Sequence, residues 1–281
     1  MLSLVFAAVS ALVWGAGDFC GGKASQRVNS LVVTLLAEAV GVPLLLYIIV
    51  SDPSAPSFAD VLWGTGAGLV GIVGLAVFYR GLSGGAMSVV APVTATTTAA
   101  LPYGLGLLID RTPPPLAMAG AALAVVAIAL VSIGHDAGDA ELARKASART
   151  LGLALAAGAM FGLFFTMLSQ ASAESGAWPL LPGRVVGILA LAVVIRARRV
   201  SFRVPRTALG WVLVAGVFDV VANAAYLYSV HHGVLSITAP IASLYPVSTV
   251  LLAVIVDRER LRPIQLAGLG LAATALVLTA S

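Results

Sequence analysis

Charged residues are scarce in this chain, and the scarcity excludes several classes of protein. They make up 10% of the 281 residues, against about 25% in an average soluble domain. Hydrophobic residues make up 60%, and the mean hydropathy is +1.03. The chain lacks the polar surface that an ordinary soluble enzyme, a nucleic-acid-binding domain or a disordered protein needs, so we exclude these three classes.

Cysteine is almost absent, and so are the motifs of energy coupling and metal binding. The single Cys20 cannot form a disulfide within the chain and is interpreted as a small buried apolar residue. The sequence has no phosphate-binding loop of the Gly-x-x-x-x-Gly-Lys type and no Cys/His cluster with zinc spacing. We therefore expect no ATP-driven pump, no cofactor, no metal site and no catalytic residues.

Long apolar runs fill most of the chain. A transmembrane helix needs about 20 mostly apolar residues, and lipid offers no partner for unpaired backbone groups, so such runs must be helical. The sequence therefore predicts an all-α integral membrane protein with ten transmembrane helices. The predicted spans are 2–20, 30–50, 58–79, 86–109, 116–134, 151–170, 178–195, 208–230, 234–256 and 264–280.

The two halves of the chain resemble each other at an offset of 148 residues. The run from Gly85 to Pro92 matches the run from Gly233 to Pro240, and both read Gly-x-x-Ser-x-x-Ala-Pro. Further matches are Gly68 with Gly216, Pro115 with Pro263, and Gly120 with Gly268. We interpret residues 1–134 and 151–281 as two five-helix repeats, joined by a linker over 135–150.

Positive charges indicate how the repeats are oriented. Five spans are an odd number, so the second repeat enters the membrane from the opposite side. Lysine and arginine concentrate in loops that this inversion places on one face: Lys23, Arg27, Arg80, Arg144, Lys145, Arg149, Arg196, Arg198, Arg199, Arg203, Arg206, Arg258, Arg260 and Arg262, against Arg111 alone on the other. The positive-inside rule makes the rich face and the linker cytoplasmic. We expect a multi-pass protein of the plasma (bacterial inner) membrane.

Several short motifs carry a family resemblance. They are the Trp14-Gly15 pair in the first span, the doubled Gly-x-x-Ser-x-x-Ala-Pro, and the Asp-Arg turns at Asp110 and Asp257. With ten spans and the repeat, the chain resembles the ten-helix, EamA-like branch of the drug/metabolite transporter superfamily. This resemblance implies a basket-like bundle with a central cavity, and export or exchange of small metabolites, often amino acids or toxic compounds.

Polar residues within the spans are candidates for function, because a charge inside the bilayer costs several kcal/mol. Asp219, Asn223 and Tyr226 lie on one helical face at i, i+4 and i+7. We expect this stripe to contact substrate, with Asp219 binding a cation, an amine or a proton. The alternative is a structural network that ties Asp219 to neighbouring helices.

Glu38 and Arg184 occupy matching places in the second and seventh spans. Each lies roughly 9–12 Å below its own entry face at 1.5 Å per residue, and those faces are opposite. In a core about 30 Å thick the two residues would differ in depth by roughly 9 Å. Without helix tilt this is too far for direct contact, so we expect separate roles. Arg184 would attract a substrate carboxylate or phosphate, and Glu38 would hold a cation or a proton.

Four further residues are expected to contact substrate or to pack. Asp18 follows Trp14 by one turn, and the Trp14 ring could contact an amine; an interfacial aromatic anchor is the alternative for Trp14. The repeat matches Thr97 with Tyr245, which precedes Pro246. Tyr245 is expected to line the cavity, and Thr97 either does the same or packs between helices.

An inverted repeat is a recurrent architecture of secondary transporters, because exchanging the conformations of two similar halves exchanges the side on which a central site opens. We therefore expect a secondary transporter that moves a small polar metabolite by alternating access, with membrane lipids as its other partners. Export of an amino acid or related compound is the sharpest version. Proton coupling through Glu38 or Asp219, facilitated diffusion and exchange all stay open. The alternative is a polytopic enzyme or sensor for a lipid or lipid-linked substrate.

Overall fold

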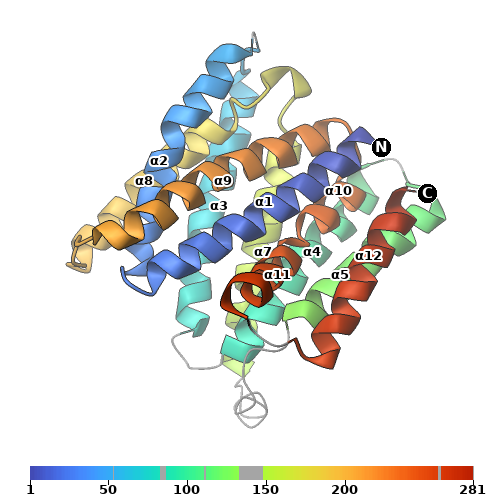
Figure 1. The fold of residues 1–281 in the computed structure, drawn as a ribbon. Helices are drawn as coiled ribbons and strands as arrows, with labels where there is room; N and C mark the ends of the chain where they lie inside the picture. The colour runs from blue at the N-terminus through green and yellow to red at the C-terminus, as the bar shows by residue number, and fades with distance from the viewer. Residues whose placement is uncertain (53, 83–86, 111, 133–147, 259–260, 281) are drawn as a thin grey trace.

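The computed structural model describes residues 1–52, 54–82, 87–110, 112–132, 148–258 and 261–280, and these form helices and the connections between them (Figure 1). The helices of the first half are α1 (Leu2–Ser25), α2 (Ser30–Ser51), α3 (Phe58–Leu82), α4 (Met87–Ile109) and α5 (Pro115–Ser132). Those of the second half are α7 (Ala148–Ser169), the short η1 (Ala173–Ser175), α8 (Leu180–Ala197), α9 (Arg206–His231), α10 (Leu235–Ala242), α11 (Tyr245–Asp257) and α12 (Pro263–Ala280).

The predicted membrane spans are confirmed as helices. Within the described residues, nine segments are long and apolar enough to cross a membrane. α4 is not among these nine, but its 23 residues include no charged side chain, and its length suffices for a crossing. The chain is therefore an all-α membrane protein, as predicted.

The ninth span differs from the prediction of one continuous helix. It is divided into α10 and α11 at Ser243 and Leu244. The amide N–H of Leu244 donates to the carbonyl of Ile241, only three residues back, at 3.0 Å, so the chain tightens there. Pro246, which has no N–H to continue the ladder, lies in the first turn of α11. The break thus falls after Pro240 rather than at it, in the interior of the span.

Reciprocal contacts between the halves follow the repeat. A Cβ atom on Gly68 of α3 would overlap the backbone of Gly183 in α8, and one on its match Gly216 in α9 would overlap the Ala37 carbonyl in α2. The same holds for two further matched pairs of glycines. Gly15 packs against α11 and its match Gly162 against α4, while Gly120 packs against α12 and its match Gly268 against α5. Each of these helices therefore packs closely on a helix of the other repeat, as small residues permit.

Contacts between helix ends establish that the repeat is inverted. α1 begins beside the end of α9, where the Ser229 hydroxyl donates to the Ser3 carbonyl at 2.7 Å. α7, the first helix of the second half, begins instead beside the end of α3, because Arg149 and Gly81 line one cavity. α1 and α3 begin on the same face, so α1 and α7 begin on opposite faces. We call the face that holds the ends of α1, α3 and α8 the basic face.

Some predicted features lie outside the described residues. They are Gly85 and Ala86 of the first Gly-x-x-Ser-x-x-Ala-Pro copy, Arg111, Arg260, and most of the linker with Arg144 and Lys145. The aspartates of the two Asp-Arg turns are described. Asp257 of α11 forms an ion pair with Lys23 of α1. Asp110 at the end of α4 accepts a hydrogen bond from the Leu235 amide at the start of α10. Both aspartates thus connect helices of different repeats.

Candidate functional site

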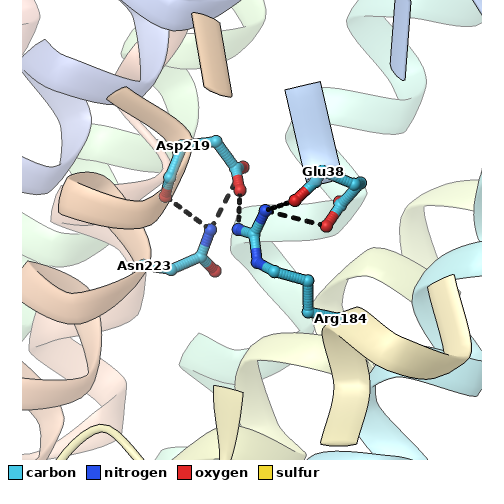
Figure 2. Close-up of polar contacts among 4 residues, drawn as sticks. All are labelled: Glu38, Arg184, Asp219 and Asn223. Carbon is cyan, nitrogen blue, oxygen red and sulfur yellow. Dashed lines mark hydrogen bonds and ion pairs between the residues drawn. The ribbon is translucent and has the colours of Figure 1, made fainter. Parts of the chain in front are cut away.

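Four polar side chains meet between α2, α8 and α9 (Figure 2). The guanidinium group of Arg184 lies at their centre, and one of its nitrogens, Nη1, is 3.0 Å from a carboxylate oxygen of Glu38. The same nitrogen donates to the Glu38 carbonyl at 2.9 Å. The other nitrogen, Nη2, forms an ion pair with Asp219. One arginine therefore bridges two carboxylates from two different helices and offsets the charge of only one of them.

The direct contact between Glu38 and Arg184 contradicts the prediction that their depths in the membrane keep them apart. That prediction estimated depth from backbone positions in untilted helices. Membrane helices tilt by about 20° on average, and a depth estimate from the backbone leaves out the length of the arginine side chain. α2 and α8 also pack against each other. Together these factors bring the two side chains into contact, although the predicted difference in depth between Glu38 and Arg184 was too large for it.

Gly41 makes room for the arginine. A Cβ atom at this position would lie 2.7 Å from Nη1 of Arg184 and 2.6 Å from a methyl group of Val220. Gly41 stands one turn after Glu38 on α2, and Gly187 holds the matching place after Arg184 on α8. The glycine that follows the charge in each repeat was visible in the sequence, but its contact with the arginine was not.

Asn223 supports Asp219 from the next turn of α9. Its side-chain amide donates to the Asp219 carboxylate at 3.1 Å and to the Asp219 carbonyl at 2.8 Å. Only 5% of the Arg184 side chain is exposed, whereas Glu38 and Asp219 are 27% and 28% exposed. The arginine of the cluster is therefore buried between the helices, while both carboxylates are partly exposed.

Asp18 adds a further carboxylate beside this cluster. It lies close enough to Asp219 and Tyr245 to interact electrostatically with both. Its side chain is exposed, and within the described residues it has no hydrogen-bond or ion-pair partner. The ring of Trp14, one turn earlier on α1, packs 5.3 Å from Phe165 and 6.2 Å from the half-buried ring of Tyr245. α1 therefore contributes an open acid and an aromatic ring to one neighbourhood.

Two predicted site residues lie elsewhere. Tyr226 has no exposed surface, and its hydroxyl donates to the Phe165 carbonyl at 2.9 Å, so it cannot contact a substrate in this conformation. Thr97 bonds to the Val93 carbonyl of its own helix at 2.8 Å and packs against Gly158 of α7. Periodicity grouped Tyr226 with Asp219, and the repeat matched Thr97 with Tyr245, but neighbouring helices decide which side chains are covered.

A cavity of about 810 Å³ opens at the basic face between α2, α3, α7 and α8. Its walls are mostly apolar, and none of the eight predicted substrate-binding residues lines it. Glu38 and Arg184 lie deeper than the cavity: its residues Leu31 and Leu191 stand seven residues before Glu38 and seven after Arg184, respectively. This separation corresponds to about 10 Å along a helix.

The matching region at the opposite face is closed. By the repeat, the cavity residues Ile72 and Leu191 correspond to Val220 and Leu45, and both of these are 0% exposed. They belong to one apolar cluster that α2, α3, α7, α8, α9, α10 and the segment before α8 share: Leu45, Ile49, Ala67, Phe165, Leu168, Ala177, Leu180, Val220, Tyr226, Leu227, Val230, Leu235, Ala239 and Ala242. The two ends of a symmetric architecture are therefore in different states.

Asp60, at the start of α3, strengthens the closed end and is not among the residues that the sequence singled out. Its carboxylate accepts hydrogen bonds from the Ser172 amide at 2.7 Å and the Ser172 hydroxyl at 3.1 Å. It also forms a reciprocal capping pair with Ser57. The pattern Ser57-x-x-Asp60 before an apolar run is a helix-start signal that could have been found. The Trp178 indole, which donates to the Ser54 carbonyl at 3.1 Å, adds a second bond between the halves.

No metal site accompanies these groups in the part of the chain that the structure describes: no three His, Cys, Asp or Glu side chains are placed to share an ion.

A model of the EamA-like transporter family matches residues 1–133 and 148–281, which are the two repeats. No curated protein matches the chain. Among solved structures 27 chains match, and one crystal structure aligns over 98% of this chain and 95% of its own, with a TM-score of 0.74 at 13% identity. At that identity the likeness concerns the fold alone.

Proposed function

Since the chain belongs to the EamA-like transporter family, we propose that it is a secondary transporter that exports small metabolites bearing an ammonium group, such as amino acids or related amines. It would work in the plasma membrane with its basic face in the cytoplasm. The site is the group of polar and aromatic residues around Arg184.

The charge balance of this site carries the proposal. Glu38, Asp219 and Asp18 supply three carboxylates against the single guanidinium of Arg184. Uncompensated negative charge inside a membrane protein is costly, and a positively charged group on a substrate offsets it. Asp18 is open, without a partner among the described residues, and Trp14 one turn away offers a ring face, which attracts cations.

Arg184 gives the site a means to hold an amino acid by both ends. Its two terminal nitrogens face Glu38 and Asp219 in this conformation. An ammonium group that enters between Asp18 and Asp219 competes with the guanidinium for Asp219. The nitrogen so released can then bind the carboxylate of the same molecule.

The difference between the two faces supports alternating access. The basic face has a cavity between α3 and α8, and the corresponding region at the other face is packed and bonded through Asp60. In an inverted repeat the two halves can exchange conformations. The exchange would close the first region and open the second, and would carry the site from one side to the other.

A thermal-shift screen of the purified protein tests the substrate class, because a ligand that binds the folded state raises its melting temperature. The probes are amino acids, amines, nucleosides and sugars at equal concentration. We expect amino acids or amines to raise the melting temperature of the wild type, and Asp18→Asn to abolish the shift while leaving the unliganded melting temperature unchanged. A shift from sugars or nucleosides alone, or one that survives in Asp18→Asn, would overturn the proposed class.

Proteoliposomes then test transport and its coupling. A bound compound should show saturable flux, and an imposed pH gradient should drive that flux if Glu38 or Asp219 exchanges a proton. Flux that responds to the substrate gradient alone would leave facilitated diffusion or exchange as the mechanism. Binding without flux would contradict the transporter proposal.

A further inference from the structure

Three arginines from three helix ends surround the cavity at the basic face. They are Arg80 at the end of α3, Arg149 at the start of α7 and Arg198 just after α8. Among the described residues that line the cavity none is acidic, and Thr150 is the one uncharged polar side chain. A cavity with this rim attracts a negatively charged group, the opposite of what the site around Arg184 requires.

The apolar wall of the cavity continues from the arginines toward the membrane interior. Ile72 on α3 and Leu191 on α8 are eight and seven residues from Arg80 and Arg198, which corresponds to about 10–12 Å along each helix. This depth leads from the level of lipid headgroups into the hydrocarbon core. Such an apolar wall makes no favourable contact with a small soluble anion, whereas an acyl chain packs against it.

Exposed apolar side chains adjoin the cavity. Val73, which lines it, is 50% exposed, and Leu189 and Val193 on the neighbouring surface of α8 are 61% and 67% exposed. A second, shallower groove along α8 includes Leu189 and Val193 together with Arg196 and Arg199. Acyl chains of the bilayer lie against such exposed apolar surface, which brings them next to the cavity.

We propose that this cavity is a binding site for an anionic phospholipid, with the phosphate among Arg80, Arg149 and Arg198 and an acyl chain between α3 and α8. Arginine suits the phosphate, because its planar donors bind phosphate oxygens in pairs. The matching region at the opposite face is packed, so the lipid binds this arrangement of the helices and favours it over the exchanged one.

Native mass spectrometry of the detergent-purified protein tests the site, with dioleoylphosphatidylglycerol and dioleoylphosphatidylcholine as probes. The variant R149A/R198A removes two arginines of the rim. Its control, R203A/R206A, removes two exposed arginines of the same face that do not line the cavity. We expect the control to retain phosphatidylglycerol as the wild type does, and R149A/R198A to bind it roughly 30-fold more weakly.

A second variant tests the apolar wall without changing charge. Ala190→Phe fills the cavity from α8, and we expect it to lose the bound phosphatidylglycerol while the melting temperature stays within a few degrees of the wild type. Equal binding of phosphatidylcholine, equal weakening in both double variants, or full binding by Ala190→Phe would overturn the proposal. So would displacement of the lipid by an equal concentration of glycerol phosphate, since that result identifies a site for soluble anions. None of these outcomes depends on whether the protein transports an ammonium compound.

Discussion

Glu38 and Arg184 occupy matching positions in the two repeats, and they form an ion pair of 3.0 Å across the boundary between the halves. The repeat therefore places opposite charges where two related helices, α2 and α8, meet. Asp219 of α9 completes the group by binding the second nitrogen of the guanidinium. The arginine therefore links its own helix, α8, to α2 and α9.

Removing the arginine should destabilise the protein more than its single charge suggests. Arg184→Ala leaves two carboxylates without their partner, and breaking a buried ion pair typically costs about 3–5 kcal/mol. We expect about 3 kcal/mol here, because Glu38 and Asp219 are 27% and 28% exposed and water screens them in part. Thermal unfolding in detergent measures the loss, with the exposed Arg203→Ala as the control. Equal melting temperatures for the two variants would contradict the central role of Arg184.

Gly41 should tolerate no side chain. In Gly41→Ala the new Cβ would lie 2.7 Å from Nη1 of Arg184 and 2.6 Å from Val220, and overpacking typically costs about 1–3 kcal/mol. Gly21→Ala, also within a helix, is the matched control, because nothing lies within 4 Å of its Cβ position. Melting temperatures of both variants check the prediction. A Gly41→Ala protein as stable as Gly21→Ala would show that the arginine moves aside at little cost.

Asp60 should hold the face opposite the basic face closed. Asp60→Ala removes the acceptor of two Ser172 hydrogen bonds, each worth about 0.5–1.5 kcal/mol net, and should shift the population toward opening. The measurement is the maleimide labelling rate of a cysteine placed at Ala177, which is 8% exposed in the apolar cluster at that face, in a Cys20→Ser background. We expect faster labelling in Asp60→Ala and an unchanged rate in the exposed Glu174→Ala. An unchanged rate in both would separate Asp60 from the closed state.

Tyr226 should matter for stability and not for binding. Tyr226→Phe removes the hydrogen bond to the Phe165 carbonyl, and a typical hydrogen bond contributes about 0.5–1.5 kcal/mol net to stability. The ligand-induced thermal shift of any compound that binds the wild type should persist in this variant. Tyr245→Phe is the comparison, because its hydroxyl has no hydrogen bond within the described residues and its melting temperature should stay unchanged. A lost ligand shift in Tyr226→Phe would place Tyr226 in the site after all.

The sequence determined those properties that depend on neighbouring residues alone. Apolar runs of sufficient length specify helices in lipid, and the 148-residue repeat with an odd number of spans specifies inversion. The polar residues inside the spans were also visible, so Glu38, Arg184 and Asp219 could be singled out. The break at Ser243 and Leu244 was not visible, because the hydropathy of the span continues through it.

Which of those polar residues meet depends on how the helices pack. Helix tilt and the reach of one side chain joined Glu38 to Arg184, and the packing of α7 against α9 covered Tyr226 while Asp18 stayed open. The difference between the packed face and the face with the cavity also lies outside the sequence pattern, since the repeat makes the two ends alike. Periodicity specifies the face of a helix, but the position and angle of its neighbours decide what that face contacts.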